Sequence, residues 1–414
     1  MKDVGRRGRA AASRMLDRIV KSGHMIVVAL LSTLGLFCAA GLSGAAAQGD
    51  FYSAAGVDLA ALRPGALIRS QAIWWAPNGT RAYRVLYRSS GLRDEPIAVS
   101  GVVIVPDGPA PAGGRKIVAW AHPTTGVVSR CAPSLARVLF RSIQGLDIMA
   151  RRGYAVAATD YPGLGTAGPH PYLVGESEGR AVLDSVRAAR QVPGVGDGRA
   201  FAVWGHSQGG QAALFTGLLA RSYAPDLDLV GVSAAAPATE LGTLMSDDMG
   251  TPGGDNLTAM TLWAWAKVFG APMDKVVTPQ AVPVIDRLAG MCIERFFDVF
   301  ARRGPSRQLA RSFLSVDDLP ELQPWRSLME ESTPGPLPAG MPVFLAQGTT
   351  DNIVDPKVTS AYMEQLCRAG SPVRMQWLPG VGHAFAARDG APAAMRWIAD
   401  RFAGAPAPSD CGRP

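Results

Sequence analysis

Short apolar runs alternate with helix-compatible segments after about residue 80, and this alternation limits the possible folds more than any other feature of the chain. The apolar runs cover residues 82–87, 97–105, 117–121, 154–159, 201–204, 230–235, 343–347 and 373–378. The helix-compatible segments cover residues 142–151, 178–190, 208–221, 357–368 and 392–402. Several runs are almost wholly apolar, which is typical of strands buried on both faces. The pattern therefore predicts an α/β fold with a mostly parallel central sheet flanked by helices.

One long segment, residues 241–338, interrupts this alternation. It has no clear strand, but it holds several aromatic residues and an amphipathic run that ends at Phe300. A Pro- and Gly-rich stretch, residues 333–340, leads to the next strand, so we interpret the segment as a helical insertion. Residues 48–240 and 339–414 are then the two parts of one core, the second with a C-terminal tail. The chain has 414 residues, 48% hydrophobic and 18% charged, which suits a large core and excludes disordered, collagen and coiled-coil proteins.

The motif with the clearest chemical meaning is Gly-His-Ser-Gln-Gly at residues 205–209. The pattern G-x-S-x-G is common by chance, but here the apolar run 201–204 precedes it and the helical segment 211–220 follows it. A strand, a sharp turn and a helix in this order form a nucleophile elbow. The turn holds the serine in a strained backbone conformation, and the chain passes so close to both flanking positions that glycine is favoured there. We predict that Ser207 is a nucleophile. The alternative is a Gly-Ser loop that opens a helix.

A serine nucleophile needs a base within hydrogen-bond reach, usually a histidine. The chain has five histidines, namely His24, His122, His170, His206 and His383. His24 lies in the leader, His206 is beside the nucleophile in the elbow, and His122 ends an early strand. His170 precedes the nucleophile in a Pro-rich loop, whereas His383 follows the run 373–378. The chain order serine, acid, histidine selects His383.

The acid that orients the histidine is expected in the loop after the preceding strand, residues 343–347. Asp351 is the first acid beyond that run. Asp355 precedes Pro356 and a helical segment, which is the place of an N-cap with proline at the first helical position. We therefore predict Asp351 as the orienting carboxylate and a structural role for Asp355.

Acyl transfer also requires N–H donors for the developing oxyanion. One donor should be the backbone N–H of Gln208, directly after the nucleophile. The second is expected in the loop after the run 117–121. Pro123 has no N–H, so Thr124 is the expected donor and Thr125 is the alternative.

Together, these motifs resemble the secretory lipase family of α/β-hydrolases, which includes the fungal lipase A type and many actinobacterial relatives. The resemblance spans residues 65 to 403. It rests on residues 122–126 with 131–134, 154–156 with 160–165, 205–209, 348–351 and 382–383.

The resemblance implies an α/β-hydrolase core with a helical lid inserted between nucleophile and acid. It also implies cleavage of acyl esters without a cofactor, by a triad of Ser207, Asp351 and His383. Pro123 departs from the family, whose members commonly have glycine there, and this leaves open which threonine N–H faces the oxyanion. Asp160 and Tyr161 match a family pattern that we interpret as structural, with the acid capping a Pro- and Gly-containing turn.

Residues 1–47 have the features of an export signal. A basic stretch precedes an uncharged apolar segment that ends in small residues, and cleavage is expected after Ala47. A retained membrane anchor is the alternative, since the apolar segment approaches the length that spans a bilayer. The leader holds seven basic and two acidic residues, so it accounts for most of the net charge of +7. The remainder has no run of like charge that could follow a phosphate backbone, which argues against a nucleic-acid partner.

Four of the five cysteines remain once Cys38 leaves with the leader. An even number in an exported chain indicates two disulfides, with three possible pairings. We favour Cys131 with Cys292 and Cys367 with Cys411, because the second pair would tie down the Pro- and Ala-rich tail. A zinc site built from four thiolates is the alternative, but no C-x-x-C spacing supports one, so no metal is expected.

The sequence thus predicts an exported serine ester hydrolase resembling triacylglycerol lipases, acting on acyl-ester or lipid substrates with transient contact at a lipid interface. No cofactor is expected. Two alternatives stay open: acyl transfer to an alcohol other than water, and a catalytically silent hydrolase fold that serves as a binding protein.

Overall fold

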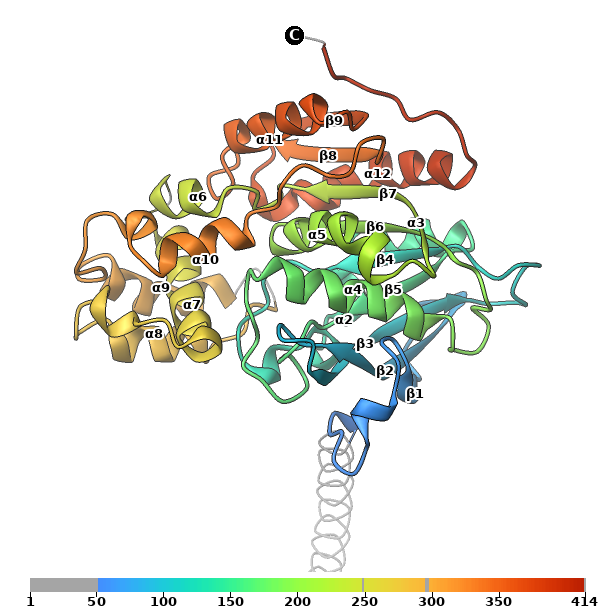
Figure 1. Cartoon of the computed structure of the whole chain (residues 1–414), viewed down its shortest axis with the longest axis horizontal. Helices are drawn as coiled ribbons and strands as arrows, with labels where there is room; N and C mark the ends of the chain where they lie inside the picture. Colours follow the sequence, from blue (N-terminus) through green and yellow to red (C-terminus); the bar gives the residue numbers. More distant parts are fainter. Residues whose placement is uncertain (1–50, 248, 295–297, 413–414) are drawn as a thin grey trace, which may run out of the picture. The chain divides into compact units, whose positions relative to one another are not determined.

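A nine-stranded sheet forms the centre of the fold (Figure 1). The computed structural model describes residues 51–247, 249–294 and 298–412; the leader, with Cys38 and the expected cleavage site after Ala47, lies outside them. The chain divides into two units, Met1–Ser53 and Ala54–Pro414, and the sheet and its helices belong to the second. The strands are β1 (Leu67–Ile73), β2 (Thr80–Ser90), β3 (Pro96–Pro106), β4 (Ile117–Ala121), β5 (Ala155–Thr159), β6 (Ala200–His206), β7 (Asp228–Ala235), β8 (Val343–Gly348) and β9 (Val373–Leu378).

The strand order is β1-β2-β3-β5-β4-β6-β7-β8-β9. Strands β1, β2 and β3 are antiparallel to their neighbours. The other six strands, β4 to β9, are parallel to one another. The prediction of a mostly parallel sheet is confirmed. All six parallel strands end at the same edge, so the loops after them can bring distant residues together.

The structure adds one strand that the sequence did not indicate. β1 is an edge strand whose residues are mostly half-buried or exposed, with charged and polar side chains among them. A strand with one free edge and little burial lacks the apolar pattern by which the other strands were predicted.

The helices lie between the strands, in the order that the alternation predicts. They are α2 (Leu139–Ser142), α3 (Leu146–Arg151), α4 (Gly175–Ala189), α5 (Gln208–Tyr223), α6 (Leu241–Asp247), α7 (Pro252–Phe269), α8 (Val282–Ala289), α9 (Asp298–Leu309), α10 (Trp325–Ser332), α11 (Pro356–Arg368) and α12 (Ala386–Phe402). Single turns of 3-10 helix are η1 (Leu59–Ala61), η2 (Ser129–Cys131), η3 (Pro133–Leu135), η4 (Met273–Lys275), η5 (Leu319–Glu321) and η6 (His383–Phe385).

Two helix boundaries differ from the expectation. The predicted segment 142–151 is two short helices, because Gly145 adopts φ 82°, in the left-handed region, between them. The predicted helix 392–402 begins six residues earlier, at Ala386, and runs through Pro392. Its first turns are buried against the sheet, and this packing outweighs the backbone hydrogen bond that the proline cannot make.

The sheet is buried on both faces. Along β4, Val118 and Trp120 point into one apolar layer with side chains of α3 and α12. The alternate residues Ile117 and Ala119 point into the other layer, with side chains of α4, α5 and α11. Because strand side chains alternate between faces, burial on both sides explains why these runs are apolar throughout.

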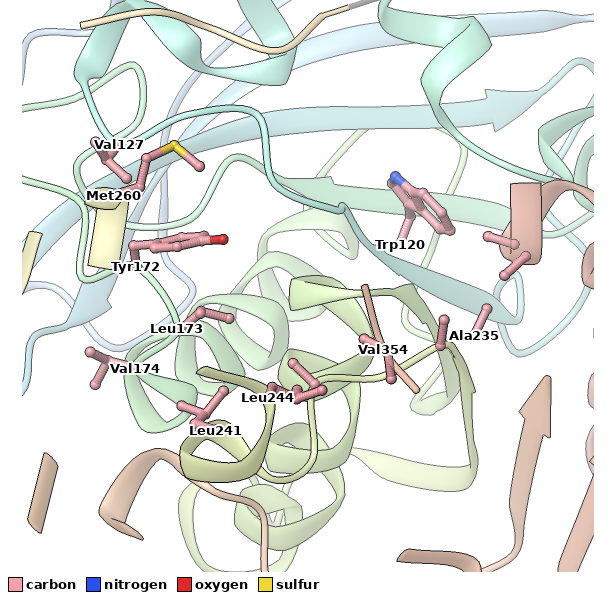
Figure 2. Packing of buried hydrophobic residues seen from close by; sticks show 14 of the residues in the cluster. Trp120, Val127, Tyr172, Leu173, Val174, Ala235, Leu241, Leu244, Met260 and Val354 are labelled. Carbon is pink, nitrogen blue, oxygen red and sulfur yellow. The ribbon is translucent and has the colours of Figure 1, made fainter. Parts of the chain in front are cut away.

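Helices α6 to α10 connect β7 to β8 and gather beside the sheet (Figure 1). Their apolar side chains, among them Leu241, Leu244 and Met260, are continuous with the layer that holds Trp120 (Figure 2). Trp265 is fully buried and donates its indole N–H to the carbonyl of Tyr172 at 2.9 Å. The insertion therefore packs on the core through an extensive apolar contact.

Two disulfides cross the fold with the pairings favoured from the sequence. Cys131–Cys292 joins η2 to the segment between α8 and α9, and Cys367–Cys411 ties the C-terminal tail to the last turn of α11. Within residues 51–412, apart from the four positions that the structure does not describe, no helix has the length and apolar character to span a bilayer. The described residues also include no cluster of three or more histidine, cysteine or acidic side chains that could hold a metal ion.

Candidate active site

Ser207 lies on the sharp turn between β6 and α5. Its backbone has φ 58° and ψ −120°, a conformation that costs a non-glycine residue about 1–3 kcal/mol and that clusters at functional sites. The flanking glycines are required sterically. A Cβ at Gly205 would lie 1.9 Å from the carbonyl oxygen of Gly209, and a Cβ at Gly209 would lie 2.0 Å from that of Ala121. The turn therefore presents the serine in the way that the elbow motif predicts.

The three residues selected from the sequence meet at the carboxyl edge of the parallel strands. His383 Nε2 is 2.8 Å from Ser207 Oγ, and His383 Nδ1 is 2.8 Å from Asp351 Oδ2. Asp351 follows β8, and His383 begins η6 after β9. A hydroxyl, an imidazole and a carboxylate thus form a continuous hydrogen-bonded chain.

The carboxylate of Asp351 is held by further donors. Its Oδ1 accepts the backbone N–H groups of Ile353 and Val354, both at 2.9 Å, and its Oδ2 accepts Nε2 of Gln347 at 3.2 Å. Burial alone would raise the pKa of Asp351, but the hydrogen bond and charge of His383 and the two backbone donors hold it below its usual value. Asp351 therefore stays ionised near neutral pH and can orient the imidazole.

Asp355, the other acid of this loop, caps α11. Its side chain accepts the backbone N–H of Lys357 at 2.8 Å, and Pro356 occupies the first helical position. The structural role predicted for Asp355 is confirmed, and of these two acids Asp351 is the one that contacts His383.

His206 bonds the backbone of the loop that carries His383 and not the Ser207 hydroxyl. Its Nε2 lies 3.0 Å from the backbone carbonyl of His383. A carbonyl can only accept, so this nitrogen carries the proton. Burial lowers the pKa of His206 to about 3, which keeps the ring neutral. The role of His206 as an anchor for the loop of the candidate base was not visible in the sequence.

The other two described histidines are structural. His122 and His170 are buried, and burial lowers their pKa values to about 4 and about 3. His122 Nε2 lies 3.2 Å from the carbonyl of Asp160, and His170 Nδ1 lies 2.8 Å from the carbonyl of Pro162. Their ring nitrogens are engaged by the loop after β5, which agrees with their exclusion as the base.

Asp160 and Tyr161 cross-link this region. Asp160 accepts Ser100 Oγ at 2.6 Å and the backbone N–H of Ser134 at 2.8 Å, and burial raises its pKa to about 6. Tyr161 donates its hydroxyl to the carbonyl of His122 at 3.2 Å. Both are structural, as expected, but the Asp160 carboxylate bonds Ser100 on β3 and Ser134 in η3 and not the turn that we expected it to cap.

The loop after β4 passes beside the elbow. A Cβ at Gly209 would lie 2.6 Å from the carbonyl of His122. Thr124 Oγ1 is 2.9 Å from the hydroxyl of Tyr172, and the carbonyl of Thr125 accepts the backbone N–H of Ile293 at 2.8 Å. Both threonines are thus anchored, one by Tyr172 and one by the insertion.

A pocket opens on Ser207 between the core and the insertion. Most of its wall is apolar and comes from the loop before α4, from α6, from α7 and from the loop after β8. The lining residues are Tyr172, Leu173, Ser207, Gln208, Ala238, Leu241, Leu244, Met245, Gly254, Leu257, Thr258, Thr261, Ile353 and Val354. Among the residues that the structure describes, this lining includes Gln208 but not Thr124. Leu173, Leu241, Leu244 and Val354 are labelled in Figure 2.

Comparison with protein families gives a match to the secretory lipase family over residues 144–410, more than half of the chain. A Mycobacterium tuberculosis protein named "Probable inactive lipase MT1628" is 26% identical, with 83% of this chain and 79% of that protein covered. Lipase 6 of Candida albicans is 25% identical, with 88% of this chain and 83% of the lipase covered.

Among solved structures, Candida antarctica lipase A in its closed state superposes with a TM-score of 0.72 at 19% identity, covering 88% of each chain. Similarity at this level of identity shows the fold alone. It confirms the predicted α/β-hydrolase fold.

Proposed function

The chain belongs to the secretory lipase family, and from this premise we propose that it is an exported serine ester hydrolase that forms an acyl-enzyme. The family and the lipase relatives support a lipase-like hydrolase acting on ester or lipid substrates. The family and the two disulfides support export. The observation that carries the mechanism is the continuous chain from Ser207 Oγ through His383 to Asp351, with both distances 2.8 Å.

In the proposed reaction, Ser207 Oγ attacks the ester carbonyl carbon while His383 Nε2 takes its proton. The C–O bond to the alcohol then breaks, and His383 returns the proton to the leaving oxygen. A water molecule, deprotonated by His383, then attacks the acyl carbon. The bond to Ser207 Oγ breaks, His383 returns the proton to that oxygen, and the acid leaves. Asp351 keeps the proton of the neutral imidazole on Nδ1, so that Nε2 is free to accept.

We propose that two backbone N–H groups bind the oxyanion. Gln208 is the first residue of α5, and the first N–H groups of a helix have no partner within it. Thr124 remains the candidate for the second donor, with Thr125 as the alternative. The anchoring of both residues supports a rigid loop, as preorganised donors require.

The apolar pocket supports an acyl chain as the part of the substrate that lies beside Ser207. α6 and α7 form one wall of it, so we propose that the insertion, residues 241–338, is the lid between the core parts 48–240 and 339–414. Transient contact with a lipid interface is part of the same proposal.

Turnover of p-nitrophenyl esters of increasing length, and then of a triglyceride emulsion, tests this function. The secreted wild-type protein should hydrolyse these esters, and Ser207→Ala should lower kcat by at least about 10³-fold. Undiminished turnover by Ser207→Ala would refute the proposal. A steep preference for short soluble esters would favour an esterase over a lipase.

Two alternatives use the same fold. Acyl transfer to an alcohol would appear as a new ester when an alcohol acceptor is added to the assay. A catalytically silent binding protein is suggested by the relative named "inactive". A folded wild-type protein without turnover of any ester, and without labelling by a fluorophosphonate, would favour that alternative.

A further inference from the structure

A buried acid lies directly behind the elbow. Glu178, on α4, is fully buried, and its Oε1 accepts Nε2 of Gln208 at 2.7 Å and the backbone N–H of Leu173 at 3.0 Å. Gln208 Nε2 also lies 2.9 Å from Nε2 of His170. His170 Nδ1 carries its proton toward a carbonyl, so its Nε2 accepts from the amide. Both hydrogens of this amide are thus engaged by residues of the loop before α4 and of α4 itself.

The cluster has two buried polar atoms without a hydrogen-bond partner in the described part of the chain, Glu178 Oε2 and Gln208 Oε1. A buried carboxyl oxygen without a hydrogen-bond partner lowers stability whether or not the group is ionised, whereas an apolar side chain would fill the same space without that cost. The acid is therefore poorly explained by stability, and its nearest chemical neighbour is the residue that follows the nucleophile.

We propose that Glu178 is a positioning residue, which holds the Gln208 side chain and thereby fixes the N–H group that follows Ser207. This inference rests on the proposed function, in which that N–H binds the oxyanion. Gln208 begins α5, so the residue that carries the anchored side chain also carries the first backbone N–H of the helix. A donor displaced by about 1 Å loses much of its effect in the transition state.

The charge of Glu178 matters for the same reason. An ionised carboxylate one side chain away from the oxyanion would oppose the negative charge that develops there. Burial raises the pKa of Glu178 to about 8, so the group is mainly neutral at pH 7. Glu178 should lose its proton above about pH 8. The negative charge of Glu178 would then lie close to the Gln208 N–H and oppose the charge of the oxyanion that this N–H binds.

The titratable groups that face Glu178 do not change charge in this range. His170 Nε2 lies 3.8 Å from Glu178 Oε1, and burial keeps this histidine neutral with a pKa of about 3. Tyr161 and Tyr172 also sense the charge of Glu178, and burial raises both of their pKa values well above the usual value for tyrosine. Arg302, which lowers the pKa of Tyr172, stays protonated.

The test compares Glu178→Gln, which keeps an acceptor but cannot ionise, with Glu178→Leu, which removes the acceptor. At pH 7 we expect Glu178→Gln to keep kcat within about 3-fold and Glu178→Leu to lower it about 10- to 100-fold, with little change in KM. Above pH 8, kcat of the wild type should fall while that of Glu178→Gln does not. Asp184→Asn is the control, since Asp184 is a buried acid of the same helix that bonds Ser89 and Tyr223 instead.

A double-mutant cycle shows whether Glu178 acts through Gln208. Gln208→Leu keeps the backbone N–H, and adding Glu178→Leu to it should lower kcat no further. Wild-type kcat in Glu178→Leu, equal losses in both Glu178 variants, or an unchanged alkaline decline in Glu178→Gln would overturn the inference. If Glu178→Leu does not fold, the pH profile of Glu178→Gln decides. Ser207→Ala in the same assay distinguishes failure of the positioning role of Glu178 from failure of the proposed function. If Ser207 is not the nucleophile, Ser207→Ala stays active; if only the role of Glu178 is wrong, Ser207→Ala is still inactive.

Discussion

Replacing Asp351 with asparagine should lower kcat by about 10⁴-fold, or about 5 kcal/mol of transition-state stabilisation. The structure determines how the amide must sit. Two backbone donors, Ile353 and Val354, bond Oδ1 at 2.9 Å, and the Gln347 amide bonds Oδ2 at 3.2 Å. The two shorter backbone bonds place the amide oxygen at Oδ1 and the NH₂ group at Oδ2, where the bond from Gln347 is lost. The NH₂ then faces His383 Nδ1, 2.8 Å away in the wild type, which must become an acceptor. The proton moves to Nε2, and the imidazole can no longer accept the proton of Ser207.

The matched control for this change is Asp355→Asn, four residues along the same loop. Asparagine is as good an N-cap as aspartate, so α11 should keep its cap and kcat should stay within about 2-fold. The assay is hydrolysis of p-nitrophenyl butyrate, with thermal unfolding to show that both variants are folded. A kcat for Asp351→Asn within 10-fold of the wild type, or an equal loss in Asp355→Asn, would refute the reasoning.

Three further predictions concern stability. Acid should destabilise the protein from about pH 6.5 downward, because buried neutral histidines are protonated only on unfolding. These buried histidines are His122, His170 and His206, whose pKa values are lowered to about 4, about 3 and about 3. The buried acids Asp160 and Glu178, with pKa values of about 6 and about 8, oppose this trend, because they take up protons in the folded state before the unfolded chain does. Urea unfolding between about pH 6 and about pH 4.5 should therefore show a net loss of about 1 kcal/mol per pH unit, three histidines against two acids, and a flat profile would contradict this. Gly209→Ala should lower the free energy of unfolding by more than about 2 kcal/mol, because its Cβ would meet a carbonyl at 2.0 Å; an unchanged melting temperature would be the opposing result. Cys367→Ser with Cys411→Ser should reduce stability by up to about 4 kcal/mol, since a loop of 44 residues opens, while kcat stays unchanged.

The core of the fold was predictable because burial on both faces makes β4 apolar throughout and β8 apolar from Val343 to Ala346. The edge strand β1 lacks this signal, since three of its seven residues are exposed to solvent and three more are only half-buried. The start of α12 was missed because Pro392 resembles a helix boundary, whereas the tertiary contact of Ala386 and Ala387 decides where the helix begins. Local pattern predicts an element well when burial is uniform along it, and poorly where packing overrides propensity.

The candidate site shows a similar division. Ser207, Asp351 and His383 could be nominated because each follows a strand in the order that the mechanism requires. The contacts that support them could not. His206 bonds a carbonyl that lies 177 positions later in the chain, and Glu178 bonds Gln208 across 30 positions. No local pattern indicates such pairs, because they depend on how α4, β6 and the loop after β9 pack together.

Labelling of the purified protein with a fluorophosphonate, followed by peptide mass mapping, tests most directly whether Ser207 is the activated nucleophile. We expect one adduct, on the peptide that contains Ser207, formed in step with loss of ester turnover and absent from Ser207→Ala. An adduct that persists in Ser207→Ala, or full turnover by a protein labelled at Ser207, would contradict the proposed mechanism.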